Sequence, residues 1–134
     1  MRRIIQQSVV LPAPAETLFA MYLDSAAHSA FTGFPVMIGV EPGAEFRAFD
    51  GQLSGVILTV VKPRVIVQSW RSVKFNVGDP DSTLTLLFSP DLSDRKLGRI
   101  DLVHLDVPEH DYADVVAGWA TYYWEPWRAY LARS

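Results

Sequence analysis

The stretch Gly118-Trp119-Ala120-Thr121-Tyr122-Tyr123-Trp124-Glu125-Pro126-Trp127-Arg128-Ala129-Tyr130-Leu131 decides the fold of this chain, because it gathers three of the four tryptophans and three of the five tyrosines. No cluster of Gly or Pro interrupts the residues from Tyr112 to Glu125, so the sequence predicts a helix. This helix is apolar and aromatic nearly all round, which a surface helix would not be. We therefore expect other elements to cover it, or the helix itself to line an apolar cavity.

Apolar and aromatic side chains recur along this helix at spacings of three and four residues, which places them on one face. The residues of that face are Val116, Trp119, Tyr123, Trp127 and Tyr130. One interpretation is ordinary core packing. The other is a cavity wall formed by Trp119, Tyr122, Tyr123 and Trp127. Buried Tyr hydroxyls and Trp N–H groups need partners, and a bound ligand can supply them.

Length and composition indicate one globular domain spanning residues 1–134. Hydrophobic residues make up 49% of the chain and charged residues 20%, which is not the composition of a disordered protein. The 12 Lys and Arg against 15 Asp and Glu give a formal net charge of −3. This balance argues against a nucleic-acid partner, since a phosphate backbone needs a basic face. The lack of cysteine excludes disulfides, thiolate zinc sites and cysteine nucleophiles.

The start of the chain does not predict a targeting or membrane segment. Arg2 and Arg3 resemble the start of a signal peptide, but Gln6 and Gln7 break any apolar run that would follow. No apolar run approaches the roughly 20 residues of a membrane span. We expect a cytoplasmic protein with no membrane span.

Turn residues divide the first third of the chain into a strand and two short helices. The sequence predicts a strand over Ile4–Leu11, stopped by Pro12, and a helix from Pro14 to about Tyr22. Asp24 and Ser25 are expected to cap a second short helix, which Gly33 and Pro35 end.

Six further β-rich runs follow at the spacing of a meander, so antiparallel pairing is the economical topology. The predicted strands are Val36–Ile38, Glu45–Phe49, Leu53–Val61, Arg64–Val73, Ser82–Phe88 and Arg99–Val107. Asp50-Gly51 is a two-residue hairpin signal. Asp111 is expected to cap the terminal helix.

The fold class is therefore α+β: a curved seven-stranded antiparallel sheet, two short helices after the first strand, and a long C-terminal helix packed across the sheet. One helix is about 10 Å wide and cannot cover strands spaced about 4.8 Å apart over the whole sheet. A cleft between sheet and helix is expected, with Gly118 letting the two approach closely.

Several short motifs occur in a fixed order along nearly the whole chain. They are Val9-x-Leu11-Pro12-Ala13-Pro14-x-Glu16, Phe31-Thr32-Gly33, Phe46-x-x-Phe49-Asp50-Gly51-x-x-x-Gly55, Val67-x-x-Trp70-Arg71 and Gly118-Trp119-x-x-Tyr122-Tyr123-Trp124-x-Pro126. This ordered set resembles the activator of heat-shock protein 90 ATPase homologue (AHSA1-like) family, part of the START-like, or SRPBCC (Bet v-type), helix-grip superfamily. The resemblance implies the fold, but that superfamily hosts transport, binding, enzymatic and co-chaperone roles.

Two strands carry polar residues that could serve a cavity. Gln68 and Trp70 share one face of their strand, so both are candidates for the interior, and Arg71 is expected in solvent. His104 is a candidate ligand contact or general base, with Asp106 two residues on to orient its ring. No nucleophile is evident nearby in sequence, so core hydrogen bonding is the simpler interpretation of His104.

The other histidines predict no metal centre. His28 follows Asp24 by four residues and is expected to form an exposed pair with it. His110 lies between Glu109 and Asp111, but neighbouring side chains point different ways and no H-E-x-x-H spacing occurs. The glycines show no phosphate-binding pattern. We expect neither metal nor cofactor.

Three functions stay open. The first is binding of a small apolar or amphipathic ligand between the sheet and the terminal helix. The second is an enzyme of the polyketide cyclase or hydrolase type that uses His104, although we favour a protein that is not an enzyme. The third is a chaperone-associated interaction protein. A homodimer also stays open, because Trp124, opposite Trp127 on the helix, needs a cover from the first helix or from a second subunit.

Overall fold

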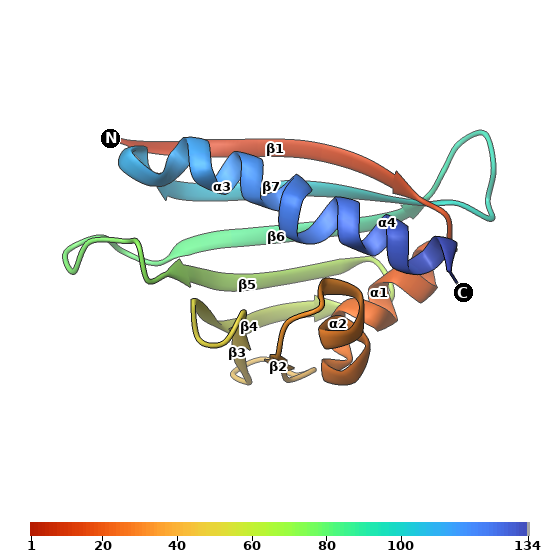
Figure 1. The fold of residues 1–134 in the computed structure, drawn as a ribbon, viewed down its shortest axis with the longest axis horizontal. Helices are drawn as coiled ribbons and strands as arrows, with labels where there is room; N and C mark the ends of the chain where they lie inside the picture. The colour runs from red at the N-terminus through yellow and green to blue at the C-terminus, as the bar shows by residue number, and fades with distance from the viewer. Residues whose placement is uncertain (134) are drawn as a thin grey trace.

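The computed structural model describes residues 1–133 of the chain. Its strands form one curved antiparallel sheet. Within these residues the sheet has seven strands in the order β1-β7-β6-β5-β4-β3-β2 (Figure 1). The strands are β1 (Arg2–Leu11), β2 (Val36–Ile38), β3 (Glu45–Ala48), β4 (Leu53–Val61), β5 (Val65–Ser72), β6 (Ser82–Pro90) and β7 (Gly98–Pro108). The meander from β2 to β7 is confirmed, and β1 pairs antiparallel with β7.

The two short helices follow β1 as predicted, and their end signals are confirmed. Helix α1 spans Ala15–Leu23 and α2 spans Ser25–Thr32. The Asp24 carboxylate accepts hydrogen bonds from the N–H groups of Ala26 and Ala27 at the start of α2. Gly33 ends α2 with a φ of 79°, a left-handed conformation that glycine adopts without steric cost.

The C-terminal part of the chain forms one run of helix across a face of the sheet (Figure 1). Its segments are η1 (Glu109–Asp111), α3 (Tyr112–Gly118), η2 (Trp119–Trp124) and α4 (Glu125–Ala132). Segment η2 is a π-helix, whose hydrogen bonds reach one residue further than in an α-helix, as from the Glu125 N–H to the Ala120 carbonyl. Asp111 stands at the N-cap position of α3, as predicted, but its side chain makes no capping hydrogen bond there.

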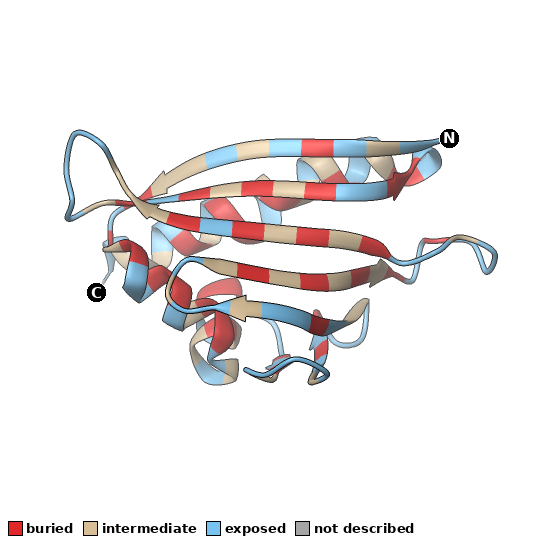
Figure 2. Ribbon diagram, turned by 180° about the vertical axis from the view of Figure 1, so that it is seen from behind, coloured by how far each residue is buried: buried red, intermediate tan, exposed pale blue. Residues whose placement is uncertain are grey.

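The core lies between the helical run and the facing side of the sheet. Buried residues alternate along the strands with more exposed ones (Figure 2). Gln68 and Trp70 both face inward on β5, as their shared face predicted. Arg71, expected in solvent, instead donates to the carbonyls of Asn76 and Asp79 and steadies the β5–β6 loop.

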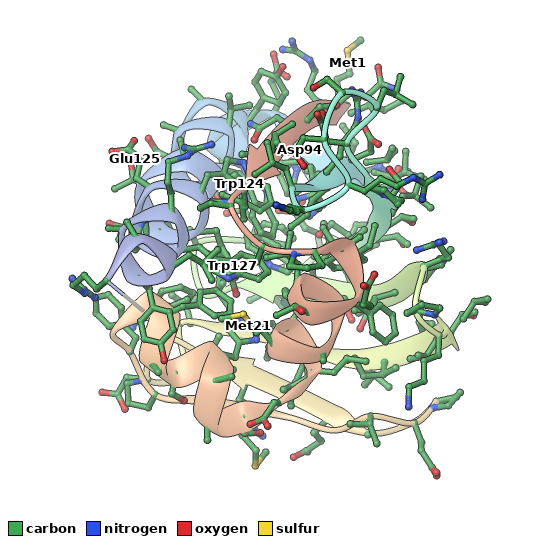
Figure 3. All side chains as sticks on the ribbon, turned by 90° about the vertical axis from the view of Figure 1, so that its right-hand side faces the viewer. Met1, Met21, Asp94, Trp124, Glu125 and Trp127 are labelled. Atoms are coloured by element: carbon green, nitrogen blue, oxygen red, sulfur yellow. The ribbon has the colours of Figure 1, made fainter. Side chains whose placement is uncertain are left out.

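Two tryptophans fix the helical run to the rest of the fold, and both point inward while Glu125 points away (Figure 3). The Trp127 ring stacks on Phe31 of α2, with centroids 4.0 Å apart and planes within 7°. Trp124 is buried against β1, where its indole Nε1 donates to Gln7 Oε1 at 2.8 Å. Trp124 therefore takes a partner from β1 of the same chain, and neither the first helix nor a second subunit is needed to cover it.

Candidate functional site

An open cleft with a volume of about 360 Å³ lies between the helical run and the β3–β5 side of the sheet. Its mouth is aromatic. Phe34 follows α2, Phe49 lies in the β3–β4 turn, and Tyr122 comes from η2. The ring centroids of Phe49 lie 5.1 Å from Phe34 and 5.7 Å from Tyr122. Phe34 is 44% exposed and Tyr122 50%, so large apolar rings face solvent at this mouth.

Backbone geometry brings these rings together. Phe49 has a φ of 55°, and with Asp50 and Gly51 it makes a turn with three successive left-handed residues rather than a two-residue hairpin.

Gly118 also lines the cleft. A Cβ placed on Gly118 would meet the Tyr122 ring at 3.6 Å, an ordinary contact, so the expectation of a close approach between Gly118 and the sheet is wrong.

Two buried indoles form the inner wall of the cleft. Trp70 of β5 and Trp119 of η2 have ring centroids 6.3 Å apart. The Trp119 Nε1 group donates a hydrogen bond to His104. The Trp70 Nε1 group is buried, and no residue from 1 to 133 accepts its hydrogen. A buried N–H without an acceptor is unfavourable. The Nε1 group of Trp127, which does not line the cleft, is in the same state.

The far end of the cleft is polar. Ser72 and Lys74 reach it from the end of β5, and Asp111 and Asp114 from the start of the helical run. Lys74 Nζ lies 3.7 Å from an Asp114 oxygen, in a pair that is well exposed. Asp111 is only 3% exposed. Burial raises the pKa of the Asp111 carboxyl, and the nearby Lys74 charge partly opposes that rise.

His104 is a fully buried residue behind the cleft wall. An indole N–H can only donate, so Trp119 fixes His104 Nδ1 as an acceptor, at 3.2 Å. The other nitrogen, Nε2, then carries the proton and donates to Ser82 Oγ at 2.8 Å, and Ser82 donates to the Trp70 carbonyl. Burial lowers the pKa of His104 to about 3. The single lone pair of the neutral ring is occupied, so the geometry gives no support to His104 as a general base.

The expected orientation of His104 by Asp106 is wrong. Asp106 has a φ of 62°, which breaks the strand alternation and turns its side chain outward. Its carboxylate lies 3.7 Å from Arg2 Nε at the surface.

His28 is also buried, which overturns the expected exposed pair with Asp24. Its Nδ1 donates to the Tyr22 carbonyl at 2.7 Å, and its Nε2 accepts from the Tyr123 hydroxyl at 2.8 Å. Burial lowers the pKa of His28 to about 4, although the hydrogen bond to Tyr22 opposes that shift. Nearby, the Tyr22 hydroxyl donates to Gln68 Oε1. These polar groups satisfy one another inside the core.

The sequence candidates thus divide into two groups. Trp70, Trp119, Tyr122 and Tyr123 line the cleft. Gln68, His104 and Trp127 are buried with core partners and do not line it. Trp127 stacks on Phe31 of α2 instead of facing the cleft.

The cleft lining also includes residues that were not sequence candidates: Phe34, Phe49, Gln52, Leu53, Ser72, Lys74, Asp111, Asp114 and Val115. Among them Phe49 carried a local signal, since an aromatic residue directly before Asp-Gly stands at the tip of a hairpin. The others come from separate segments that tertiary packing brings together.

Residues 1–133 contain no group of three or more His, Cys, Asp or Glu side chains placed to hold a metal ion. His110 instead contacts the Lys74 carbonyl through Nε2. No helix in this part of the chain combines the length and apolar character needed to cross a membrane.

The sequence of this chain is similar to a family of known proteins. The family model described as "Activator of Hsp90 ATPase homolog 1-like protein" matches residues 12–132. The human activator of 90 kDa heat shock protein ATPase homolog 1 is 27% identical over 126 residues, which cover 92% of this chain and 35% of the human protein. An uncharacterised protein of Schizosaccharomyces pombe is 32% identical over 74 residues, covering 55% of this chain and 22% of that protein. The chain therefore spans about a third or less of the length of these relatives.

Solved structures share the helix-grip fold. The crystal structure of an HSP90 activator from Plasmodium falciparum matches with a TM-score of 0.84 and 20% identity, over 96% of both chains. The Aha1 dimer from Colwellia psychrerythraea matches with a TM-score of 0.74 and 9% identity, over 90% of both chains. Ara h 8.0201 matches with a TM-score of 0.74 and 10% identity over the whole of both chains. At these identities the likeness establishes the fold.

Proposed function

The chain belongs to the family of activator of Hsp90 ATPase homolog 1-like proteins, and from that premise we propose that it binds a small, largely apolar ligand in the cleft between its sheet and its C-terminal helix. The observation that carries this proposal is the cleft mouth. Phe34 and Tyr122 are about half exposed beside an opening of about 360 Å³. A concave, mostly apolar surface with a few polar groups is the usual form of a small-molecule site.

The packing around the cleft supports a preformed site. Tyr123, beside the mouth, is held by its hydrogen bond to His28 and by an edge-on contact with Phe49. Trp119 is held by His104. Walls that are fixed before binding lose little freedom when a ligand arrives.

Titration with Nile red, a neutral environment-sensitive dye, tests the proposal. We expect saturable binding of one dye per chain. The Tyr122→Ala variant removes half-exposed aromatic surface from the mouth and should weaken dye binding by about fivefold or more. Leu92→Ala is the matched control, since Leu92 is fully exposed on the β6–β7 loop, and its dye affinity should stay within about twofold. Dye uptake that does not saturate, or that both variants change equally, would contradict the proposal.

A second candidate is association with an Hsp90-type chaperone. It is supported by the 27% identity to the human activator over 92% of this chain. The chain spans 35% of that protein's length, so activation of an ATPase is a separate proposal from binding. Calorimetric titration with the Hsp90 of the same organism, together with its ATPase rate, tests both. Binding without a change in rate would support association alone, and no binding would remove this candidate.

Self-association is a further proposal, supported by the similarity in fold to a protein whose solution structure is that of a dimer. Sedimentation equilibrium over a range of concentrations tests it. A constant mass of 15.0 kDa would contradict it.

A further inference from the structure

We propose that the occupant of the cleft is an organic cation, a molecule with an apolar body and a protonated amine that pairs with the carboxylate of Asp111. This inference rests on the proposed function, because it names the chemical class of the ligand for that same cleft. It adds to the proposed function because the polar end of the cleft carries a net negative charge, which favours cationic ligands over anionic ones.

The central observation is the carboxylate of Asp111. Asp111 lines the cleft and is 97% buried, since only 3% of its surface is exposed. Among residues 1–133 its side chain has no hydrogen-bond donor and no ion-pair partner within 4.0 Å. Its oxygens are not among the buried side-chain atoms of residues 1–133 that lack a hydrogen-bond partner, so the carboxylate is open to the cleft, where a cationic group of a ligand can reach it.

The neighbouring charges leave this end of the cleft negative. Lys74 and Asp114 lie 3.7 Å apart and offset each other. Asp111 adds a second negative charge, which the positive charge of Lys74 also reaches, so these three side chains together carry one net negative charge. His110 is engaged with the Lys74 carbonyl through Nε2 and adds no acidic group. A ligand carboxylate would meet repulsion from both aspartates, whereas an ammonium would be attracted.

The aromatic lining fits the same class of ligand. Tyr122, Phe49 and Trp119 present rings to the cleft. The faces of such rings attract organic cations, and an aromatic surface next to a carboxylate is the combination that recognises amines in many sites. The unpartnered Nε1 group of Trp70 lies in the same wall and would suit a hydroxyl or carbonyl oxygen on the ligand.

Three probes with the same tail and different head groups test the inference: octylammonium, octanol and octanoate. Their affinities are measured by isothermal titration calorimetry at pH 7.5, below the concentrations at which they form micelles. We expect octylammonium to bind about tenfold more tightly than octanol, and octanoate to bind most weakly. The Asp111→Asn variant should bind octylammonium about tenfold more weakly and octanol as before.

Asp94→Asn is the matched control, because it removes the same charge from an exposed position on the β6–β7 loop, outside the cleft lining. Its affinity for octylammonium should stay within about threefold of the native value. Asp111 has no partner to lose, so Asp111→Asn should keep the native Tm or exceed it, and thermal unfolding checks this.

The outcomes separate the two proposals. If the three probes bind equally, if octanoate binds most tightly, or if Asp111→Asn keeps the preference for octylammonium, the cation is the wrong class of ligand while the apolar cleft stands. If none of the probes binds and Nile red does not bind either, both proposals fall.

Discussion

The hydroxyl of Tyr123 donates a hydrogen bond to Nε2 of His28, with 2.8 Å between oxygen and nitrogen. The two residues are 95 positions apart and both are buried. Since Nδ1 of the same ring donates to the Tyr22 carbonyl, the ring is held as a neutral tautomer. The bond ties α2 to the π-helical segment η2 and holds Tyr123 in the wall of the cleft.

Tyr123→Phe is expected to lower the free energy of unfolding by about 1–3 kcal/mol, because it leaves a buried acceptor nitrogen on His28 without a donor. Urea unfolding at pH 7.5 measures the loss. Tyr122→Phe is the control, since its ring is half exposed and its hydroxyl has no such partner, and it should change stability by less than about 0.5 kcal/mol. Equal stability of native protein and Tyr123→Phe would show that the hydrogen bond contributes nothing net.

Stability should fall as the pH is lowered below neutrality. Burial lowers the pKa of His28 to about 4 and that of His104 to about 3, so the folded state keeps both rings neutral where the unfolded chain takes up protons. The unfolded state then binds more protons from about pH 6.5 downward, and stability decreases with pH until the folded-state pKa values are reached.

The expected size of this effect is roughly 4 kcal/mol between pH 7.5 and pH 5, from two histidines together. The opposite shift of Asp111, whose pKa is raised by burial, offsets part of the loss. Urea unfolding at the two pH values gives the difference directly. A free energy of unfolding that is the same at both values would contradict the buried, neutral state of these rings.

Substitutions of Trp127 test whether this residue packs in the core or contacts a ligand. The sequence placed it among the candidates for the cavity wall. Trp127 is fully buried and stacks on Phe31. For Trp127→Ala we expect a loss of about 3–5 kcal/mol in unfolding free energy, as for other large-to-small changes in a core. The milder Trp127→Phe should keep the protein folded and keep Nile red affinity within about twofold. A large fall in dye affinity for folded Trp127→Phe would return Trp127 to the site.

Local signals predicted most of the fold. Turn residues separated the β-rich runs, so the meander followed from the sequence, and alternation placed Gln68 and Trp70 on one face of β5. Asp24 and Gly33 marked the ends of α2 because a capping carboxylate and a left-handed glycine act on their immediate neighbours. The wide sheet under one helix also indicated a cleft, and one is present.

Long-range contacts account for what the sequence did not predict. A histidine on an eight-residue helix is typical of a surface position, and the burial of His28 is made favourable by the Tyr22 carbonyl and the distant Tyr123 hydroxyl. Asp106 left the predicted face because a left-handed residue interrupts the strand. The π-helical turn at Trp119–Trp124 carries no sequence signal that helical periodicity could detect, since its aromatic residues suit an α-helix equally well.

The sequence predicted cleft residues along the helical wall and at Trp70 of β5. Trp119, Tyr122 and Tyr123 were found because they share one continuous helix. The mouth and the polar end of the cleft are formed by residues from separate segments, such as Phe34 and Asp111. These residues lie close together only because the elements pack as they do.

The central claim is that the cleft binds a small apolar molecule, and filling the cleft from its own wall tests this most directly. Gly118 lies in the helical run with open cleft beside it, and a side chain there starts at an ordinary distance from Tyr122. Leu in place of Gly also favours the helix by up to about 1 kcal/mol, so Gly118→Leu should fold at least as stably as the native chain. The decisive measurement is the Nile red affinity of folded Gly118→Leu. We predict that the affinity for Nile red falls tenfold or more, and a tenfold change in Kd is about 1.4 kcal/mol of binding free energy. Native affinity in a folded Gly118→Leu would contradict binding in this cleft.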